Sequence, residues 1–230
     1  MNARDSILGR VREALRIGVV AHSAASGIEP SADLVGVRRF LPKVPNDFPA
    51  QVALLAEQSV NLKTEFLPCP DEAAAGAKLK LLSDRENWES VAFPADSEIR
   101  TLLSALTIPK LEVSRSTVKT DLAKVSAGIT GCDALIAQTG SVLLTATSGG
   151  GRALSVLPAH HVVIATTSQL VPDLPAAFEL LERKYGANFP SFITFITGPS
   201  RTGDIERILV LGAHGPRKLT IIMVGNEGVI

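Results

Sequence analysis

The sequence has little of what would direct it to nucleic acids or metals. Its 23 basic and 23 acidic side chains leave no net charge, and only 4% of its residues are aromatic. Long-range attraction to a nucleic acid or an anionic membrane is therefore weak, and stacking platforms for single strands are scarce. The two cysteines, Cys69 and Cys132, form no CxxC pair and have no histidine at ligand spacing. We therefore expect no structural zinc or iron–sulfur cluster to be held by this chain alone.

Targeting signals are also lacking. Residues 1–16 mix charged and apolar positions without an uninterrupted hydrophobic region, and no apolar run in the sequence reaches membrane-spanning length. Two isolated thiols suit a reducing compartment. We therefore expect a cytoplasmic protein, and 230 residues with 46% hydrophobic content can bury a proper core.

The N-terminal part combines a helical pattern with an irregular stretch. Apolar residues at spacings of three and four predict an amphipathic helix over residues 3–16. Residues 18–49 contain several helix breakers and little periodicity, so we expect a mobile arm. "DFPAQVALLAEQSV" then predicts a helix capped by Asp47, with Pro49 in its first turn. We predict two regions, a helix with a flexible arm over 1–49 and an α/β domain over 50–230.

Within the α/β domain, short apolar runs alternate with helical patterns. Strands are expected at "TEFLPC", "SVAFP", "HHVVIAT", "SFITFIT" and "KLTIIMV", and helices at "DEAAAGAKLKLL", near "DSEIRTLLSAL" and at "LPAAFELLERKYG". The pattern of residues 125–147 indicates closely spaced strands with one short helix. Several runs are apolar on both faces, which is typical of strands covered by helices on each side. The pattern predicts a three-layer α/β/α sandwich with a mostly parallel sheet.

Loops that follow strands are where such sheets bind ligands, and the first candidate is in "IAQTGSVLL". Gln138, Thr139, Gly140 and Ser141 offer an amide, two hydroxyls and a glycine that lets a ligand approach the backbone. Local evidence favours a β-hairpin turn over a ligand site here.

The second candidate is in "TSGGGRALSVLP", where three consecutive glycines, residues 149–151, precede Arg152. A glycine-rich loop can form an anion nest, and a guanidinium can bind a carboxylate or phosphate. A connecting loop without a ligand is equally well supported.

The third candidate is "FITGPSRTGDIERILVLGAHGP", residues 195–216. Ser200 or Thr202 is expected to cap a helix that begins near Asp204. Arg201 lies in the same turn and could hold an anion together with free N–H groups.

We expect these three loops to meet at the carboxyl end of the sheet. Arg152 and Arg201, with Ser200, Thr202 and the 139–141 turn, would then form one anion site.

The histidines offer weaker signals. His160 and His161 stand at the start of a strand, where polar residues satisfied by the backbone are the simplest interpretation. His214 lies between glycines in "GAHGP" and is a weak candidate for a general base. His22 lies in the irregular arm and carries no signal.

Three stretches carry a resemblance to a known family. "GITGCDALIAQTGSVLL", "GGGRALSVLPAHHVVIA" and "ITGPSRTGDIERILVLGAHGPRKLTIIMV" resemble, in the expected order, the lactate-utilisation protein C family (LutC, or YkgG), whose conserved unit is the LUD domain. The resemblance covers the chain from about Ile129 onward. It implies the fold of glucosamine-phosphate isomerase, ribose-phosphate isomerase and CoA transferases (NagB/RpiA/CoA-transferase-like). It also implies a role in oxidising L-lactate to pyruvate with two partner proteins, at least one of which carries iron–sulfur clusters.

One position departs from the family pattern. Members often have Glu where this chain has Gln138. A glutamate is the nucleophile in CoA transferases of the related fold, and an amide cannot take that role. Covalent acyl transfer through Gln138 is therefore disfavoured, although its amide can still hydrogen-bond a ligand.

Three functions remain open. The chain could be a subunit of a lactate-oxidising complex that binds a small carboxylate, a phosphate-bearing ligand or an organic cofactor. It could instead be a non-catalytic assembly module for iron–sulfur partners, or a free-standing phosphosugar isomerase or CoA transferase. Since the sequence shows neither a cluster ligand set nor a hydride-cofactor fingerprint, a complex-dependent role is favoured.

Overall fold

A computed structural model gives the fold. It describes residues 4, 7, 9, 10, 13, 36, 38–95, 99–114, 116–205, 208–212 and 214–225. The chain divides into two compact units, Met1–Leu41 and Pro42–Ile230. In the first unit, the described residues between 4 and 13 are helical, as the apolar spacing predicts. Most of the predicted arm, including His22, lies outside the described residues.

Side-chain caps start the first helices of the second unit. Helix α3 (Phe48–Leu62) begins after Asp47, whose carboxylate accepts a hydrogen bond of 2.9 Å from a backbone N–H of the first turn. Helix α4 (Glu72–Arg85) begins in the same way after Asp71, at 2.7 Å. Each cap satisfies a donor that has no partner within the helix. The predicted helix capped by Asp47 is therefore confirmed.

The central sheet has six strands, all of them parallel. Their order across the sheet is β1-β12-β7-β4-β2-β3. The bounds are Glu65–Cys69 (β1), Lys218–Val224 (β12), His160–Thr166 (β7), Ala127–Thr130 (β4), Val91–Pro94 (β2) and Lys110–Val113 (β3). Strands β12 and β7, two neighbouring interior strands, are buried along nearly their whole length. Val, Ile and Leu dominate them because both of their faces are covered.

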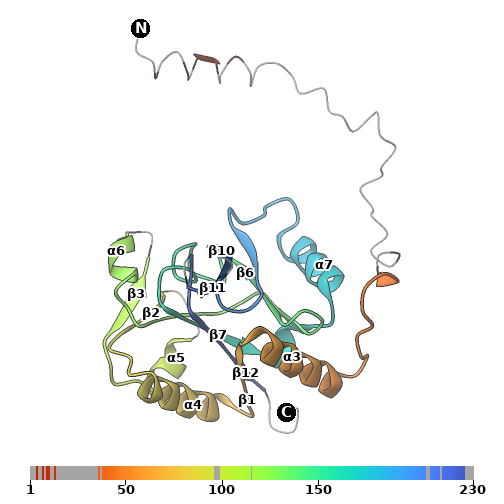
Figure 1. The fold of residues 1–230 in the computed structure, drawn as a ribbon, viewed down its shortest axis with the longest axis horizontal. Helices are drawn as coiled ribbons and strands as arrows, with labels where there is room; N and C mark the ends of the chain where they lie inside the picture. Colours follow the sequence, from red (N-terminus) through yellow and green to blue (C-terminus); the bar gives the residue numbers. More distant parts are fainter. Residues whose placement is uncertain are drawn as a thin grey trace. The chain divides into compact units, whose positions relative to one another are not determined.

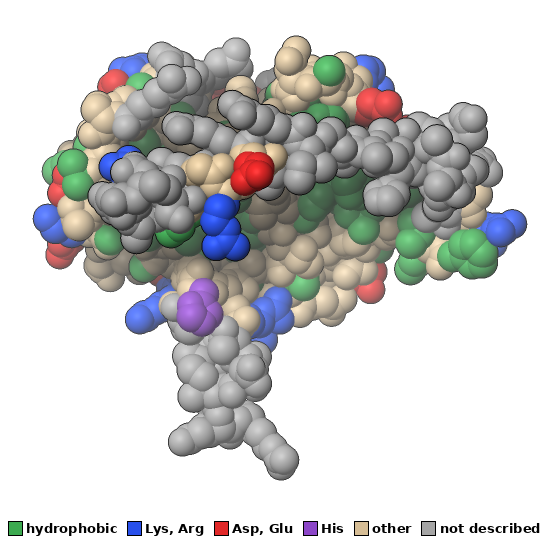
Figure 2. Space-filling model, turned by 90° about the horizontal axis from the view of Figure 1, so that it is seen from above, with side chains coloured by type: hydrophobic (Ala, Val, Ile, Leu, Met, Phe, Trp, Pro, Cys, Tyr) green, Lys and Arg blue, Asp and Glu red, His purple; other side chains and the backbone are tan. Residues whose placement is uncertain are grey.

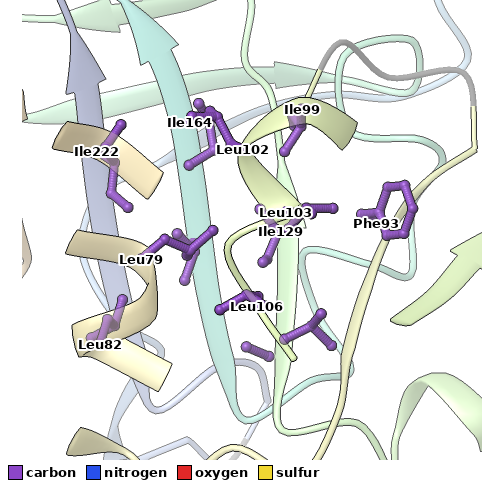
Figure 3. Close-up of a cluster of buried hydrophobic side chains, with 14 of the residues drawn as sticks. Leu79, Leu82, Phe93, Ile99, Leu102, Leu103, Leu106, Ile129, Ile164 and Ile222 are labelled. Atoms are coloured by element: carbon purple, nitrogen blue, oxygen red, sulfur yellow. The ribbon is translucent and has the colours of Figure 1, made fainter. Parts of the chain in front are cut away.

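Helices α4 and α5 (Arg100–Leu103) cover one face of this sheet. Figure 3 shows Leu79 and Leu82 of α4 and Leu102 and Leu103 of α5 beside strand residues such as Ile222. Leu79 is fully buried and Leu103 nearly so. This apolar cluster fixes α4 and α5 on the sheet.

A second, smaller sheet and α3 cover the other face. The small sheet has the order β8-β5-β6-β9, with bounds Leu170–Val171, Ala134–Ile136, Ser141–Thr145 and Ile193–Ile196. Leu55 of α3 and Leu144 of β6 pack with Val163 and Met223 of the central sheet. Helix α7 (Leu174–Tyr185) packs on the small sheet through a separate cluster that includes Leu181. Figure 1 shows α7 at the upper right and α4 and α5 together at the bottom.

The predicted α/β fold with a parallel central sheet flanked by helices is confirmed, with corrections in detail. The small sheet extends the layer on the α3 side. The short helix predicted within residues 125–147, all of which are described, is not formed. Residues 137–140 form the turn between β5 and β6 instead. Strand β3 was not predicted. The expected helix near residues 96–106 is only α5, and residues 96–98 lie outside the described part.

The remaining elements are short: α6 (Lys119–Leu122), the 3₁₀ helix η2 (Thr167–Gln169), and a hairpin of β10 (Arg201–Ile205) and β11 (Ile208–Leu211). Among the described residues, no helix is both long and apolar enough to cross a membrane. In Figure 2, described acidic and basic side chains are scattered over the face shown, without a large area of one sign. This distribution agrees with the balanced charge of the sequence.

Candidate functional site

Two adjoining hollows lie at the carboxyl ends of the central strands, and we call them together the carboxyl-edge cleft. The larger hollow, of about 1080 Å³, is lined by the ends of β2 and β3, by α6 and by the loop that follows β6. The smaller one, of about 300 Å³, reaches the ends of β7 and β12. Pro94 and Thr147 line both. Open α/β sheets bind ligands at this edge, so the cleft is the first candidate site.

The glycine-rich loop, residues 149–151, lies in this cleft, as the sequence predicts. Gly150 and Gly151 have φ values of 64° and 113°, which favour glycine. A Cβ on Gly150 would come within 2.6 Å of Pro94, so the loop packs closely on the end of β2. The N–H groups of Gly149 and Gly151 already donate to the carbonyls of Thr145 and Ala146, at 2.9 Å each. Two donors that an anion nest would need are therefore in use, and the loop acts mainly by placing Arg152.

Arg152 and Lys119 give the larger hollow a basic character. Nη2 of Arg152 donates to the carbonyl of Ser191 at 2.8 Å. A guanidinium carries five N–H donors, so this bond orients the side chain and leaves donors for a ligand. Ser114, Ser116 and Thr117 add hydroxyls, and none of the described lining residues is acidic. The hollow suits a carboxylate or a phosphate group.

A buried carboxylate lies behind the cleft. The side chain of Asp133, with no exposed surface, accepts hydrogen bonds from Ser148 Oγ (2.5 Å), Lys184 Nζ (2.6 Å) and Tyr185 OH (2.6 Å). Burial opposes ionisation, but the bonds from Lys184, Ser148 and Tyr185 hold the pKa of Asp133 below its usual value. Ser148 also lines the smaller hollow. The network ties the loop after β6 to the end of α7.

Sequence reasoning missed Asp133, although a signal was present. It is the one charged residue in the apolar run "CDALIA". A carboxylate inside a buried run must be paired, so its position alone predicts a network of donors around it.

The predicted site residues 138–140 lie in the hairpin turn that local evidence favours, and Ser141 begins β6 opposite Ile136. Thr139 Oγ1 donates to Ser141 Oγ, and Ser141 Oγ lies 2.8 Å from Thr197 Oγ1. Gly140, at φ 66°, packs on α3, and Gln138 Nε2 donates to the carbonyl of Pro42 at 2.8 Å. None of the residues 138–141 lines the carboxyl-edge cleft.

The helix predicted to begin near Asp204 is wrong. Residues 201–205 are strand β10, paired antiparallel with β11, and Arg201 lies opposite Leu211. The backbone pairing with β11 overrides the capping pattern that the local sequence suggested. The side chain of Thr202 lies outside the described residues.

Ser200 and Arg201 take other roles in the structure. The N–H of Ser200 donates to the carbonyl of Pro216, and its carbonyl accepts from Gly212. Nη2 of Arg201 donates at 2.7 Å to the carbonyl of Leu62, in the last turn of α3. Arg201 therefore caps the end of a distant helix.

The structure brings only part of the predicted anion site together. The 139–141 turn and Arg201 both meet α3 near Leu62. Arg152 is bound to Ser191, before β9 begins, whereas Arg201 follows the end of β9. Because the strand separates the two arginines, their predicted convergence is wrong.

His160 and His161 are buried at the start of β7. His160 Nε2 lies 2.8 Å from Thr220 Oγ1, and His161 Nε2 lies 2.9 Å from Thr130 Oγ1. Burial lowers their pKa values to about 4 and about 3. Both rings are neutral at pH 7, and side chains, rather than the backbone, supply the partners of their Nε2 atoms. Among the described residues, no three His, Cys, Asp or Glu side chains gather into a metal site.

The fold and the cleft define an α/β protein with a parallel sheet and a basic hollow at its carboxyl edge. The sequence profile of the LUD domain matches residues 71–224, and the chain belongs to the LUD domain family. It is 32% identical over 190 residues to "Lactate utilization protein C" of Bacillus velezensis, covering 76% of this chain and 78% of the relative. It is 33% identical over 185 residues to the protein of the same name from Shouchella clausii, covering 76% and 80%.

A solved structure shares the fold. It is described as the crystal structure of a DUF162 family protein from Deinococcus radiodurans, with a TM-score of 0.61 and 22% identity. The match covers 79% of this chain and all of that chain. The likeness supports the α/β architecture.

Proposed function

We propose that this chain is a component of an L-lactate utilisation system, in which it binds a small carboxylate in the carboxyl-edge cleft. It acts in the oxidation of lactate to pyruvate together with partner proteins that carry iron–sulfur clusters. The names of its relatives support the role in lactate utilisation. The observation that supports the ligand is the larger hollow, with Arg152 and Lys119 and no described acidic lining residue.

Removing Arg152 tests the ligand. Losing a charge-assisted hydrogen bond costs about 1.5–3 kcal/mol, so Arg152→Ala should weaken binding of L-lactate or pyruvate roughly 10- to 150-fold by isothermal titration calorimetry. Arg183→Ala is the matched control, because Arg183 is an exposed arginine on α7 outside the cleft. Equal affinities of the two variants, or no binding by the unaltered chain, would contradict the ligand assignment.

Growth tests the biological role. A strain of the source organism that lacks this chain should fail to grow on L-lactate and should grow normally on pyruvate. Affinity purification of the chain from lactate-grown cells should recover proteins with iron–sulfur absorption. Growth on lactate without the chain would refute the proposed role.

The same experiments separate the alternatives. Flat ligand titrations with retained partners would identify a non-catalytic assembly module. A CoA transferase of the related kind needs a nucleophilic carboxylate, and the amide of Gln138 is engaged with Pro42 instead. A free-standing transferase or phosphosugar isomerase therefore has less support.

A further inference from the structure

A second cavity, of about 370 Å³, shares no lining residue with the carboxyl-edge cleft. Its walls come from β9 and the residues that flank it, from residues 155–156 and 214–216, and from the start of β7 and β12. We call it the histidine cavity, because buried His161 and exposed His214 both line it.

Two buried polar atoms of this cavity have no partner. His161 is 1% exposed and Ser155 is 3% exposed. Within the described part of the chain, neither His161 Nδ1 nor Ser155 Oγ makes a hydrogen bond. Buried polar groups are rarely left unpaired, so these two atoms are candidate donors to a group that binds at the cavity.

The backbone explains why these two residues lie together. Gly128 of β4 is opposite His161 in the sheet register. A Cβ on Gly128 would clash with the carbonyl of Leu154 and come within 2.9 Å of Pro158. Only a glycine lets the segment that carries Ser155 lie so close to the sheet.

The hydrogen bond to Thr130 assigns the tautomer of His161. The hydroxyl of Thr130 is buried, and its only partner among the described residues is His161 Nε2. A buried hydroxyl needs an acceptor for its proton, so Thr130 donates and Nε2 accepts. Nδ1 then carries the proton of the neutral ring. His161 Nδ1 and Ser155 Oγ are therefore two buried donors on residues that line the cavity.

The charge of the lining limits the ligand further. Among the described residues, the lining of the histidine cavity includes no Asp, Glu, Lys or Arg, and Phe192, Ile196 and Leu219 supply apolar surface. A charged ligand group would be desolvated there without a counter-charge. An uncharged ring with a carbonyl oxygen fits the two donors and the apolar walls.

We propose that the histidine cavity binds an uncharged planar ring compound that bears a carbonyl group, whose oxygen accepts hydrogen bonds from His161 Nδ1 and Ser155 Oγ. Quinones and flavins have such carbonyls within the ring, and nicotinamide has one attached to it. The site stands independently of the lactate role and of the carboxyl-edge cleft.

Titration of the full chain with menadione, riboflavin and nicotinamide tests the proposal and distinguishes the three sources. We expect one of these probes to bind, and Ser155→Ala to weaken its binding about tenfold by ligand-observed NMR. Ser104→Ala is the control, because it removes an exposed hydroxyl that lines neither the histidine cavity nor the carboxyl-edge cleft. Its affinity should equal that of the unaltered chain.

A measurement without substitution guards against effects on folding. The ¹⁵N signal of His161 Nδ1 should shift when the bound probe is added to the unaltered chain, whereas the signals of His160 should stay in place. Failure of all three probes to bind would overturn the proposal. Binding that leaves the Nδ1 signal unchanged, or that Ser155→Ala and Ser104→Ala affect equally, would overturn it as well.

Discussion

Replacing Asp133 by Asn tests whether the buried network behind the cleft holds the domain together. The carboxylate has no exposed surface and accepts three hydrogen bonds of 2.5–2.6 Å, from Ser148, Lys184 and Tyr185. Asn keeps the shape of the Asp133 side chain but replaces one carboxylate oxygen, which accepted hydrogen bonds, by an NH₂ group that can only donate them. At least one donor then faces another donor and loses its partner.

The size of the effect follows from the burial of the partners. Removing one member of a fully buried ion pair costs about 3–5 kcal/mol, which is an upper bound here. The Lys184 side chain is 48% exposed, so water compensates part of its loss. The bonds from Ser148 and Tyr185 to a charged group contribute about 1.5–3 kcal/mol each, and Asn retains part of this. We expect Asp133→Asn to lower the free energy of unfolding by about 2–4 kcal/mol.

Urea unfolding followed by circular dichroism measures this loss. Asp121→Asn is the matched control, because Asp121 pairs with Lys124 at 3.5 Å on the surface, with both side chains more than half exposed. Its effect should stay below about 0.5 kcal/mol. A change of that small size in Asp133→Asn would refute the reasoning.

The pH dependence gives a second check. The folded-state pKa of Asp133 lies below its unfolded value, so the contribution is fully present above about pH 4 and is lost as the pH falls through the folded pKa. The difference between the unaltered chain and Asp133→Asn should therefore be the same at pH 7 and pH 5 and shrink toward pH 3. A difference that does not change down to pH 3 would show that ionisation of Asp133 contributes nothing.

Three further outcomes are expected. Gly140→Ala should destabilise the domain by more than about 1 kcal/mol, since its φ is 66° and a Cβ would lie 2.8 Å from the side chain of Leu62. Gly131→Ala should cost less in the same urea titration, because Gly131 has no positive φ and a Cβ there would come no nearer than 3.5 Å to the carbonyl of Ser148. Arg201→Ala should lower the free energy of unfolding by about 1 kcal/mol, because it removes the bond to the end of α3, and it should leave calorimetric titrations with lactate unchanged. Elemental analysis of chain purified without chelators should find less than about half an equivalent of iron or zinc, and a larger amount would contradict the ligand count from the sequence.

The elements that the sequence predicted well carry their signal locally. Asp47 with a proline in the next turn fixes the start of α3 within four residues of chain. The strands β7 and β12 are rich in Val, Ile and Leu, because both faces of an interior parallel strand are covered. Neither inference needs a distant residue.

The errors concern pairing between distant residues. A Ser or Thr before an acidic residue suits a helix start, but strand pairing between Arg201 and Leu211 decides the conformation. The direction of β9, which separates Arg152 from Arg201, depends on its antiparallel pairing with β6, whose sequence lies some fifty residues earlier. Propensity and capping rules contain no information on such pairings.

The length of β7 keeps the two proposed sites apart. His161, near its start, lines the histidine cavity, and Thr166, at its end, lines the carboxyl-edge cleft. At about 3.3 Å per residue, five residues of parallel strand place these positions roughly 16 Å apart. A molecule as small as lactate cannot touch both, so a carboxylate in the cleft and a ring in the cavity would be separate ligands. Coupling between them would have to pass through the sheet itself, and β7 contributes a lining residue to each site.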